Sequence, residues 1–244
     1  MSKSKTKTID PRERIIVALG TPDIRFAKKL IQSLKGDIKI YKVGNELFTA
    51  HGPKAVQMVR DADAKVFLDL KYHDIPNTVA SAARQAVDLG IFMFNVHVSG
   101  GLQMMQEACI AALDEAKKKN IPPPKLIGVT LLTSLNQEEV TKQIGISKSI
   151  DETVLHYAGL AQKAGLDGVV ASAREIEKIR AKMGPEFLIV TPGIRPAGAE
   201  HGDQERVMTP KEALELGANF IVIGRPITQA KDPQETVARI LAEL

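Results

Sequence analysis

The chain has little of the chemistry that marks secreted, membrane-spanning or nucleic-acid-binding proteins. Its 244 residues include one cysteine, Cys109, no tryptophan, and only 4% aromatic residues. A single cysteine excludes a disulfide within the chain, and a thiol in an apolar helical stretch is typical of core packing rather than of a nucleophile. The lack of disulfides suits a reducing cytoplasm, where we expect the protein. No apolar run is long enough to cross a membrane.

Concentrated charge is also missing. The formal net charge is +4, but the basic residues are scattered and have few aromatic residues among them. We therefore interpret them as solvated surface with a mild attraction for anionic substrates, and we expect no nucleic-acid partner. Lys3, Lys5 and Lys7 are not followed by an apolar stretch, so residues 1–12 are expected to form a disordered tail and not a signal peptide.

Short β-branched runs alternate eight times with longer amphipathic stretches. Strands are predicted at 14–19, 38–43, 65–70, 93–98, 125–131, 168–171, 188–191 and 220–223. Helices are predicted at 23–34, 53–60, 76–89, 102–118, 150–164, 173–183, 210–216 and 233–244. Helix starts such as Thr209-Pro210 and helix ends such as Gly165 agree with these bounds. The pattern predicts one domain, a TIM (β/α)8 barrel over residues 13–244, and a doubly wound open sheet is the alternative.

The most informative charges lie in segment 67–77. Asp69 and Lys71 come near the end of an apolar predicted strand, and Asp74 lies in the loop after it. Side chains alternate along an extended strand, so Asp69 and Lys71 are expected to point the same way. Because unpaired buried charge is costly, these residues predict an ion network that faces a substrate, in preference to a structural salt bridge.

A barrel would bring further polar strand ends to the same mouth. These are Lys42, His97, Thr133, Arg195 and Arg225, which follow the second, fourth, fifth, seventh and eighth predicted strands. Lysine and aspartate side chains there would form a polarised pocket, with Lys71 as a candidate proton donor. His97 is more typical of a satisfied barrel histidine than of a functional donor.

Two segments resemble the loops that bind phosphate in many barrels. They are Thr191-Pro-Gly-Ile-Arg195 and Ile223-Gly-Arg225, at the seventh and eighth predicted strands. Glycine lets backbone N–H groups approach an anion, and arginine adds a fork of donors. Segment 135–149, after the fifth strand, is longer than such a connection needs and is a candidate flap near the site.

Signatures of metals and cofactors are missing from the sequence. The five histidines have no metal-ligand spacing, and no Walker loop, dinucleotide-binding glycine motif or G-x-S-x-G motif occurs. The sequence therefore predicts neither a metal nor an organic cofactor.

The segment Asp69-Leu-Lys71-Tyr-His-Asp74-Ile-Pro76-Asn-Thr78 resembles the D-x-K-x-x-D-I-P-x-T motif of orotidine 5′-monophosphate decarboxylases. Supporting segments follow from Arg14 to the end of the chain: Tyr41-Lys42-Val-Gly44, Glu46-Leu-Phe48, Asn95-Val-His97, Leu132-Thr133-Ser134, Thr191-Pro-Gly-Ile-Arg195, Asp203-Gln204 and Gly224-Arg225. The resemblance implies a homodimeric TIM barrel that converts orotidine 5′-monophosphate to uridine 5′-monophosphate in de novo pyrimidine synthesis. It also implies that neither a metal nor an organic cofactor takes part.

The resemblance further implies a role for each matched residue. Lys71 would protonate C6 of the pyrimidine, Asp69 would lie beside the leaving carboxylate, and Lys42 would connect the ribose to the charge network. Asp74 would cross into the site of the partner subunit. The other substrate-binding residues implied are Ile75, Pro76 and Thr78, Thr133 near the pyrimidine, Gln204 between base and phosphate, and Arg195, Gly224 and Arg225 at the phosphate.

One substrate-binding position departs from the family pattern. Family members end the first strand with Ala-Leu-Asp, whereas this chain has Ala18-Leu19-Gly20, so the carboxylate expected to bind a ribose hydroxyl and Lys42 is missing. Asp23 is expected to serve the start of the first helix instead.

Two rival functions follow from these observations. One is a Mg²⁺-dependent sugar-phosphate decarboxylase or aldolase of the same superfamily, which the Ile75-Pro76-Asn77-Thr78 continuation disfavours. The other is a catalytically impaired nucleotide-binding barrel, which only Gly20 suggests.

Overall fold

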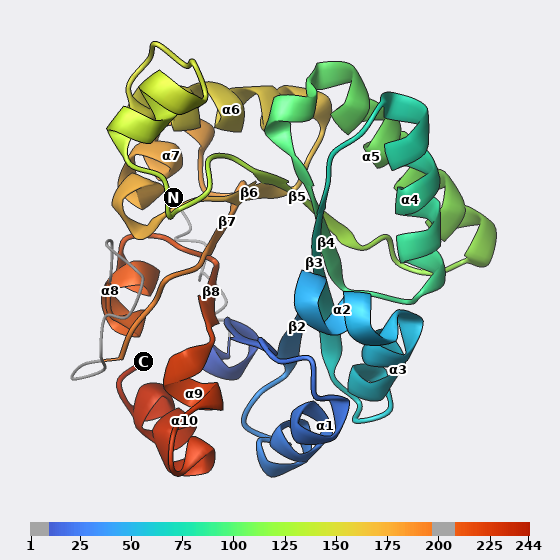
Figure 1. Ribbon diagram of the computed structural model, residues 1–244, viewed down its shortest axis with the longest axis vertical. Helices are drawn as coiled ribbons and strands as arrows, with labels where there is room; N and C mark the ends of the chain where they lie inside the picture. The colour runs from blue at the N-terminus through green and yellow to red at the C-terminus, as the bar shows by residue number, and fades with distance from the viewer. Residues whose placement is uncertain (1–9, 197–207) are drawn as a thin grey trace, which may run out of the picture.

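The computed structural model describes residues 10–196 and 208–244, which fold around a closed barrel of eight parallel strands (Figure 1). The strands are β1 (Ile15–Ala18), β2 (Ile40–Gly44), β3 (Lys65–Tyr72), β4 (Met93–His97), β5 (Lys125–Val129), β6 (Gly168–Val170), β7 (Leu188–Thr191) and β8 (Phe220–Ile223). Each strand pairs with its sequence neighbours, and β1 also pairs with β8. The predicted TIM barrel is therefore confirmed, and the open-sheet alternative is wrong because the first and last strands are hydrogen-bonded.

Helices surround the barrel (Figure 1). The α-helices are α1 (Ile24–Ser33), α2 (Asn45–His51), α3 (Pro53–Arg60), α4 (Pro76–Asp88), α5 (Leu102–Lys119), α6 (Ile150–Ala164), α7 (Ile176–Met183), α8 (Pro210–Glu215), α9 (Arg225–Thr228) and α10 (Pro233–Ala242). Short turns of other helix types are η1 (Pro11–Glu13), η2 (Val98–Gly100), η3 (Glu139–Gln143, a π-helix) and η4 (Ala173–Glu175). The sequence does not predict α2 and α9, because both are too short to show a clear helical period.

Helix ends follow the local chemistry of the sequence. The side chain of Thr209 accepts the N–H of Glu212 while the Glu212 carboxylate accepts the N–H of Thr209, which fixes the start of α8. Gly165 ends α6 with a φ of 88°, a left-handed conformation that glycine adopts without a steric cost. These signals set where each helix stops and the next strand begins.

Alternation along the strands places polar residues at the mouth of the barrel. An apolar layer fills the interior: Ile16, Ile40, Phe67, Met93, Ile127, Val190 and Val222. The residue two positions further along each strand also points inward, one layer closer to the carboxyl end. That layer contains Ala18, Lys42, Asp69, Asn95, Val129, Pro192 and Gly224. Charged and polar side chains from β2, β3 and β4 therefore lie directly above an apolar floor.

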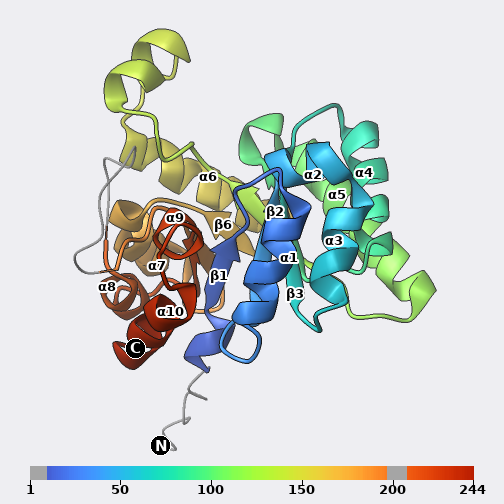
Figure 2. The ribbon, with the colours of Figure 1, turned by 60° about the horizontal axis from the view of Figure 1, so that its bottom comes forward.

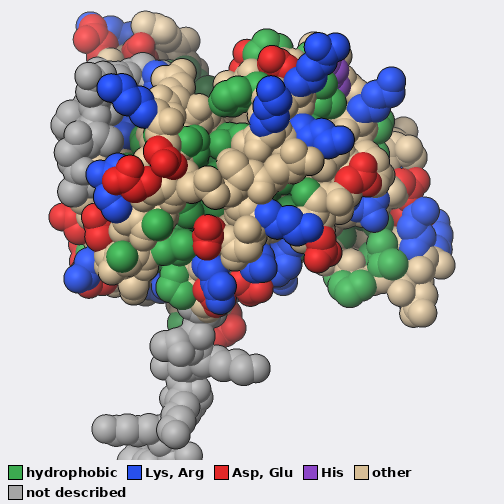
Figure 3. All heavy atoms as spheres, turned by 90° about the horizontal axis from the view of Figure 1, so that it is seen from below, with side chains coloured by type: hydrophobic (Ala, Val, Ile, Leu, Met, Phe, Trp, Pro, Cys, Tyr) green, Lys and Arg blue, Asp and Glu red, His purple; other side chains and the backbone are tan. Residues whose placement is uncertain are grey.

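The two ends of the barrel differ. The connection from β5 to α6, which carries η3, extends furthest above the mouth, whereas η1 lies at the opposite end (Figure 2). Residues 1–9 of the expected tail lie outside the described part of the chain, and its predicted boundary at residue 12 falls within η1. Basic and acidic side chains are interspersed on the face shown in Figure 3. Among the helices of the described residues, none has the length and apolar character needed to span a membrane.

Candidate active site

Three charged side chains from β2 and β3 meet above the apolar layer. Lys42 Nζ lies 2.6 Å from Asp69 Oδ2, and Lys71 Nζ lies 2.7 Å from Asp69 Oδ1. Asp69 is 7% exposed. Burial raises the pKa of Asp69, but the charges and hydrogen bonds of the two ammonium groups outweigh burial and hold the pKa below its ordinary value. These three residues, which we call the ion triad, form an ion network with the carboxylate ionised at neutral pH; Asp74, also expected in the network, is not part of it within one chain.

The backbone that carries Lys71 is not a regular strand. Between Leu68 and Tyr72, β3 advances four residues while the paired part of β4 advances two. Lys71 has a φ of 52°, and this left-handed conformation costs a residue with a side chain roughly 1–2 kcal/mol. The side chains of Asp69 and Lys71 meet, as their expected common direction implies, but they do so across a bulge and not along a regular strand.

Asn95 is a site residue that sequence reasoning misses. It is 1% exposed, its Nδ2 donates to Asp69 Oδ1 at 2.7 Å, and its Oδ1 accepts from the backbone N–H of Lys71 at 2.9 Å. A signal for it exists in the sequence. Asn95 is a polar residue two positions after inward-facing Met93, which places it in the same layer as Lys42 and Asp69.

A cavity of about 220 Å³ opens beside the ion triad. All three triad residues line it, and so does Thr133. The remaining lining residues are apolar: Phe67, Val129, Leu131, Leu132, Val170, Val190, Pro192 and Val222. Apolar walls lower the local dielectric, which strengthens the attraction between the ammonium groups and an anion. A few convergent polar groups on an apolar wall are typical of a small-molecule site.

Asp74 and the residues after it do not line this cavity within one chain. Asp74 is exposed, and its Oδ1 accepts the N–H of Ile75 at 2.6 Å. The side chain of Ile75 is also exposed, at 67%. Pro76 begins α4, and Thr78 is exposed in its first turn. The structure therefore separates these predicted site residues from the ion triad of their own chain.

Two arginines follow β7 and β8. Arg195 is 9% exposed, and its Nη1 donates to the carbonyl oxygen of Ile194 at 3.0 Å. Burial and, second, the positive charge of Arg225 lower the pKa of Arg195. Gly224 follows β8 and precedes Arg225, the first residue of α9. The two guanidinium groups concentrate positive charge at this part of the mouth.

Gln204, the remaining predicted contact, lies outside the described residues. His97 lies next to the ion triad, with its ring centroid 5.3 Å from that of His73. Burial, followed by the charges of His73 and Lys71, lowers the pKa of His97, so its ring is neutral at neutral pH. His97 does not line the cavity, which agrees with its interpretation as a barrel histidine.

Gly20 lies beside the strand that carries Lys42. The N–H of Leu19 donates to the carbonyl oxygen of Lys42 at 3.0 Å. Gly20 is exposed, its φ lies outside the left-handed region, and a Cβ placed there would meet no other described heavy atom within 4 Å. Asp23 accepts two backbone N–H groups of α1 at 2.8 and 3.2 Å, so it caps that helix as expected.

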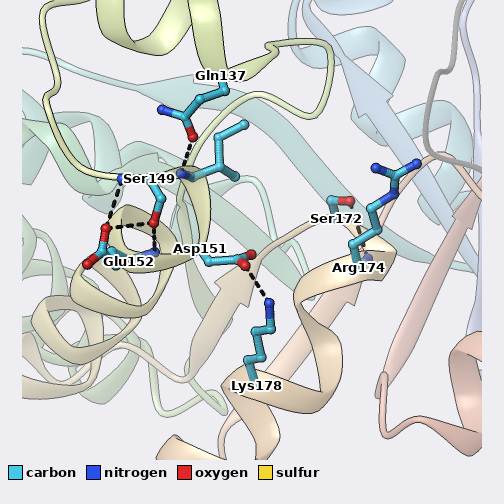
Figure 4. A network of polar contacts seen from close by, with 8 residues as sticks. Gln137, Ser149, Asp151, Glu152, Ser172, Arg174 and Lys178 are labelled. Carbon is cyan, nitrogen blue, oxygen red and sulfur yellow. Dashed lines mark hydrogen bonds and ion pairs between the residues drawn. The ribbon is translucent and has the colours of Figure 1, made fainter.

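Connection 131–149 leads from β5 to α6, and Figure 4 shows contacts of its Gln137 and Ser149 at the start of that helix. Its first three residues line the cavity. The side chain of Gln137 accepts the first N–H of α6 at 2.8 Å, and Ser149 begins that helix with a capping box. Asp151 forms an ion pair with Lys178 of α7. The contacts of Gln137 and Ser149 hold the connection to the start of α6, whereas the Asp151 ion pair joins α6 to α7. The predicted mobility of the outer part of the connection stays a prediction.

We next consider whether the described residues offer a metal site or a reactive thiol. Within 10–196 and 208–244, no three His, Cys, Asp or Glu side chains lie together where they could hold a metal ion. The expectation of a metal-free reaction stays a prediction. Burial first, and Asp167 second, raise the pKa of the half-buried Cys109 thiol to about 11, so it is protonated at neutral pH.

A closed β/α barrel with lysine and aspartate side chains converging at the carboxyl ends of its strands defines a barrel enzyme of the TIM class. Within that class, residues 13–240 match the model of the orotidine 5′-phosphate decarboxylase / HUMPS family, and the chain belongs to this family. The resemblance noted from the motif around Lys71 is therefore confirmed.

Relatives with nearly the same extent support the assignment. A protein of Moorella thermoacetica named orotidine 5′-phosphate decarboxylase is 54% identical over 233 residues, covering 96% of this chain and 92% of the relative. One of the same name from Syntrophomonas wolfei is 47% identical, covering 96% and 98%. The crystal structure of orotidine 5′-phosphate decarboxylase from Lactobacillus acidophilus aligns with a TM-score of 0.82 at 37% identity, covering 95% of this chain and 98% of that one.

Proposed function

We propose that this protein decarboxylates orotidine 5′-monophosphate to uridine 5′-monophosphate in pyrimidine biosynthesis, in the cytoplasm and without a metal or organic cofactor. The observation that carries the proposal is the ion triad at the wall of the cavity, within a chain of this family. The cavity offers a place for the base, and the ammonium of Lys71 offers a proton at its edge.

Lys71 acts on the charge that the reaction creates. When the bond between C6 and the carboxylate breaks, its electron pair stays on C6 and carbon dioxide leaves. The pyrimidine ring cannot delocalise this carbanion, so a cation fixed beside C6 lowers the barrier. Lys71 then donates a proton to C6 and is reprotonated from water.

Asp69 and Lys42 keep Lys71 in place. The carboxylate of Asp69 bridges the two ammonium groups, so the position of each is set before the reaction begins. In this role Asp69 also lies beside the carboxylate that leaves, and Lys42 connects the network to the ribose hydroxyls. These positions are supported by the place of both residues in the layer above the apolar floor.

The phosphate binds at the ends of β7 and β8. Arg195, Gly224 and Arg225 supply guanidinium and backbone donors, and the place of both arginines after neighbouring strands supports an anion site there. Thr133 contacts the pyrimidine from the cavity wall, and Gln204 bridges base and phosphate. Binding energy from the distant phosphate would orient the base at the ion triad.

The active unit is a homodimer in which Asp74 completes the site of the partner subunit, with Ile75, Pro76 and Thr78 in the same shared loop. The exposed Asp74 and Ile75 support this arrangement, because a carboxylate and a large apolar side chain face solvent on one short loop. Symmetry would place two such loops in two sites.

A continuous absorbance assay with orotidine 5′-monophosphate tests the proposal. Activity that persists in EDTA supports a metal-free decarboxylase. Activity on a sugar phosphate that requires Mg²⁺, without turnover of the nucleotide, would support the rival aldolase or sugar-phosphate decarboxylase. Nucleotide binding without turnover would support a catalytically impaired barrel.

A further inference from the structure

Asn95 is bonded to both ends of the proton-donating unit. Its amide is buried, donating through Nδ2 to Asp69 Oδ1 at 2.7 Å and accepting through Oδ1 from the Lys71 N–H at 2.9 Å. An amide offers a donor and an acceptor on two separate atoms of one carbon without adding charge, so it can bond to both groups at once. A second carboxylate there would repel Asp69, and an apolar side chain would satisfy neither group.

The bond to Lys71 meets the backbone where it is strained. Lys71 has a φ of 52° within the bulge of β3, a conformation that a residue with a side chain holds only when its surroundings enforce it. The ladder to β4 is irregular over this stretch, and Asn95 accepts the N–H of Lys71 from β4 in place of a backbone carbonyl. This side chain thus replaces a missing ladder bond.

The bond to Asp69 determines which oxygen serves which lysine. Oδ1 receives both Asn95 Nδ2 and Lys71 Nζ, whereas Oδ2 receives Lys42 Nζ. With Oδ1 held by the buried amide, the carboxylate cannot rotate without breaking that bond. Asn95 therefore fixes the Lys71 backbone directly and the direction of the Lys71 ammonium through Asp69.

We propose that Asn95 is a positioning residue for proton delivery, acting through Lys71 and Asp69. This inference rests on the proposed function. Asn95 does not line the cavity, so it has no direct role in binding the substrate. Its loss should lower kcat and leave binding nearly unchanged.

Asn95→Ala and Asn95→Leu test the inference, the second because it keeps most of the side-chain volume. We expect kcat to fall roughly 100-fold in both variants, the scale of a small misplacement of a catalytic group. KM and the Kd for uridine 5′-monophosphate should change by less than roughly threefold, because ground-state contacts are kept. A crystal structure of Asn95→Ala should show Lys71 outside the left-handed region.

Asn219 provides a matched control at the opposite end of the barrel. Its Oδ1 accepts from Arg180 Nη2 at 2.6 Å and from the N–H of Ile189 at 2.9 Å, so it also joins a strand to a charged side chain. Asn219→Ala should lower the melting temperature without lowering kcat. The inference would be overturned if the parent turns over the nucleotide and the Asn95 variants keep the parental kcat. It would also be overturned if their kcat falls only in proportion to the fraction of unfolded protein. An inactive parent would instead refute the proposed function.

Discussion

Replacing Gly20 with aspartate tests the one position where the chain departs from its family pattern. The site accommodates a side chain, since a Cβ at residue 20 meets no other described heavy atom within 4 Å and the backbone is not left-handed. The neighbouring Leu19 is hydrogen-bonded to the backbone of Lys42. Because residue 20 follows this contact, we expect a carboxylate there to reach Lys42 and the proposed ribose position.

The expected gain follows from one hydrogen bond to a charged group. Such a bond contributes about 1.5 to 3 kcal/mol, so Gly20→Asp should raise kcat/KM roughly 10 to 150-fold if the ribose hydroxyl or Lys42 uses the carboxylate. The existing Asp23 cannot supply it without leaving the start of α1, where it caps two N–H groups. The unmodified chain should nevertheless be active, because the ion triad is complete.

Steady-state kinetics with orotidine 5′-monophosphate and thermal melts on the same samples provide the measurement. Gly20→Asn is the matched control, since it adds a side chain of similar shape without charge and should gain much less. Gly20→Ala separates the loss of glycine flexibility from the effect of the new polar group. Unchanged or lower kcat/KM in a Gly20→Asp protein that melts like the parent would refute the reasoning and would indicate that another residue serves the ribose.

Four further predictions concern the ion triad, the phosphate and the shared loop. Lys71→Ala should retain the fold and product binding but keep less than about a hundredth of the parental kcat. Higher residual activity would contradict the role of Lys71 as the proton donor. Arg225→Ala should raise KM strongly, and substrate without phosphate should turn over poorly even at saturation; equal kcat for both substrates would count against the phosphate site. Mixing inactive Lys71→Ala with inactive Asp74→Ala should restore some activity through heterodimers, whereas no recovery after verified subunit exchange would argue against shared sites. Because the folded pKa of Asp69 lies below its unfolded value of about 3.9, the stability of the parent relative to Asp69→Asn should be constant above about pH 5 and decline as pH falls below about 4. Denaturant unfolding of both proteins across this pH range provides the measurement. A difference in stability that stayed constant with pH would contradict the lowered pKa of Asp69.

The strands were predictable because buried β-branched runs and helix signals agree with one another. Predicted strand 188–191 coincides with β7, and 220–223 coincides with β8. The third strand ends at Tyr72 instead of residue 70, because the bulge extends it. α2 and α9 were not predicted because each directly follows the end of a strand. Contacts with the barrel stabilise such short helices more than their own hydrophobic periodicity does.

The candidate site was predictable where alternation applies and less so elsewhere. Lys42 and Asp69 follow inward-facing Ile40 and Phe67 by two residues, so their meeting at the mouth follows from the strand period. Asn95 obeys the same rule, but a single buried amide has no motif of its own to mark it. The separation of Asp74 from the ion triad within one chain depends on the course of a loop, which the strand period does not determine.

Lys71 illustrates why the remaining geometry could not be predicted from local sequence. Its left-handed backbone would favour glycine or asparagine on local propensity, and neither occupies the position. The conformation is held by Asn95 from β4 and by Asp69 on the same strand, whose other oxygen is held by Lys42 from β2. A residue held against its local preference by contacts that connect three strands has few ways to move. For a proton donor this restriction is useful, because the ammonium would already be oriented before the substrate binds. The backbone strain thus lies at the residue to which the proposed chemistry assigns proton transfer.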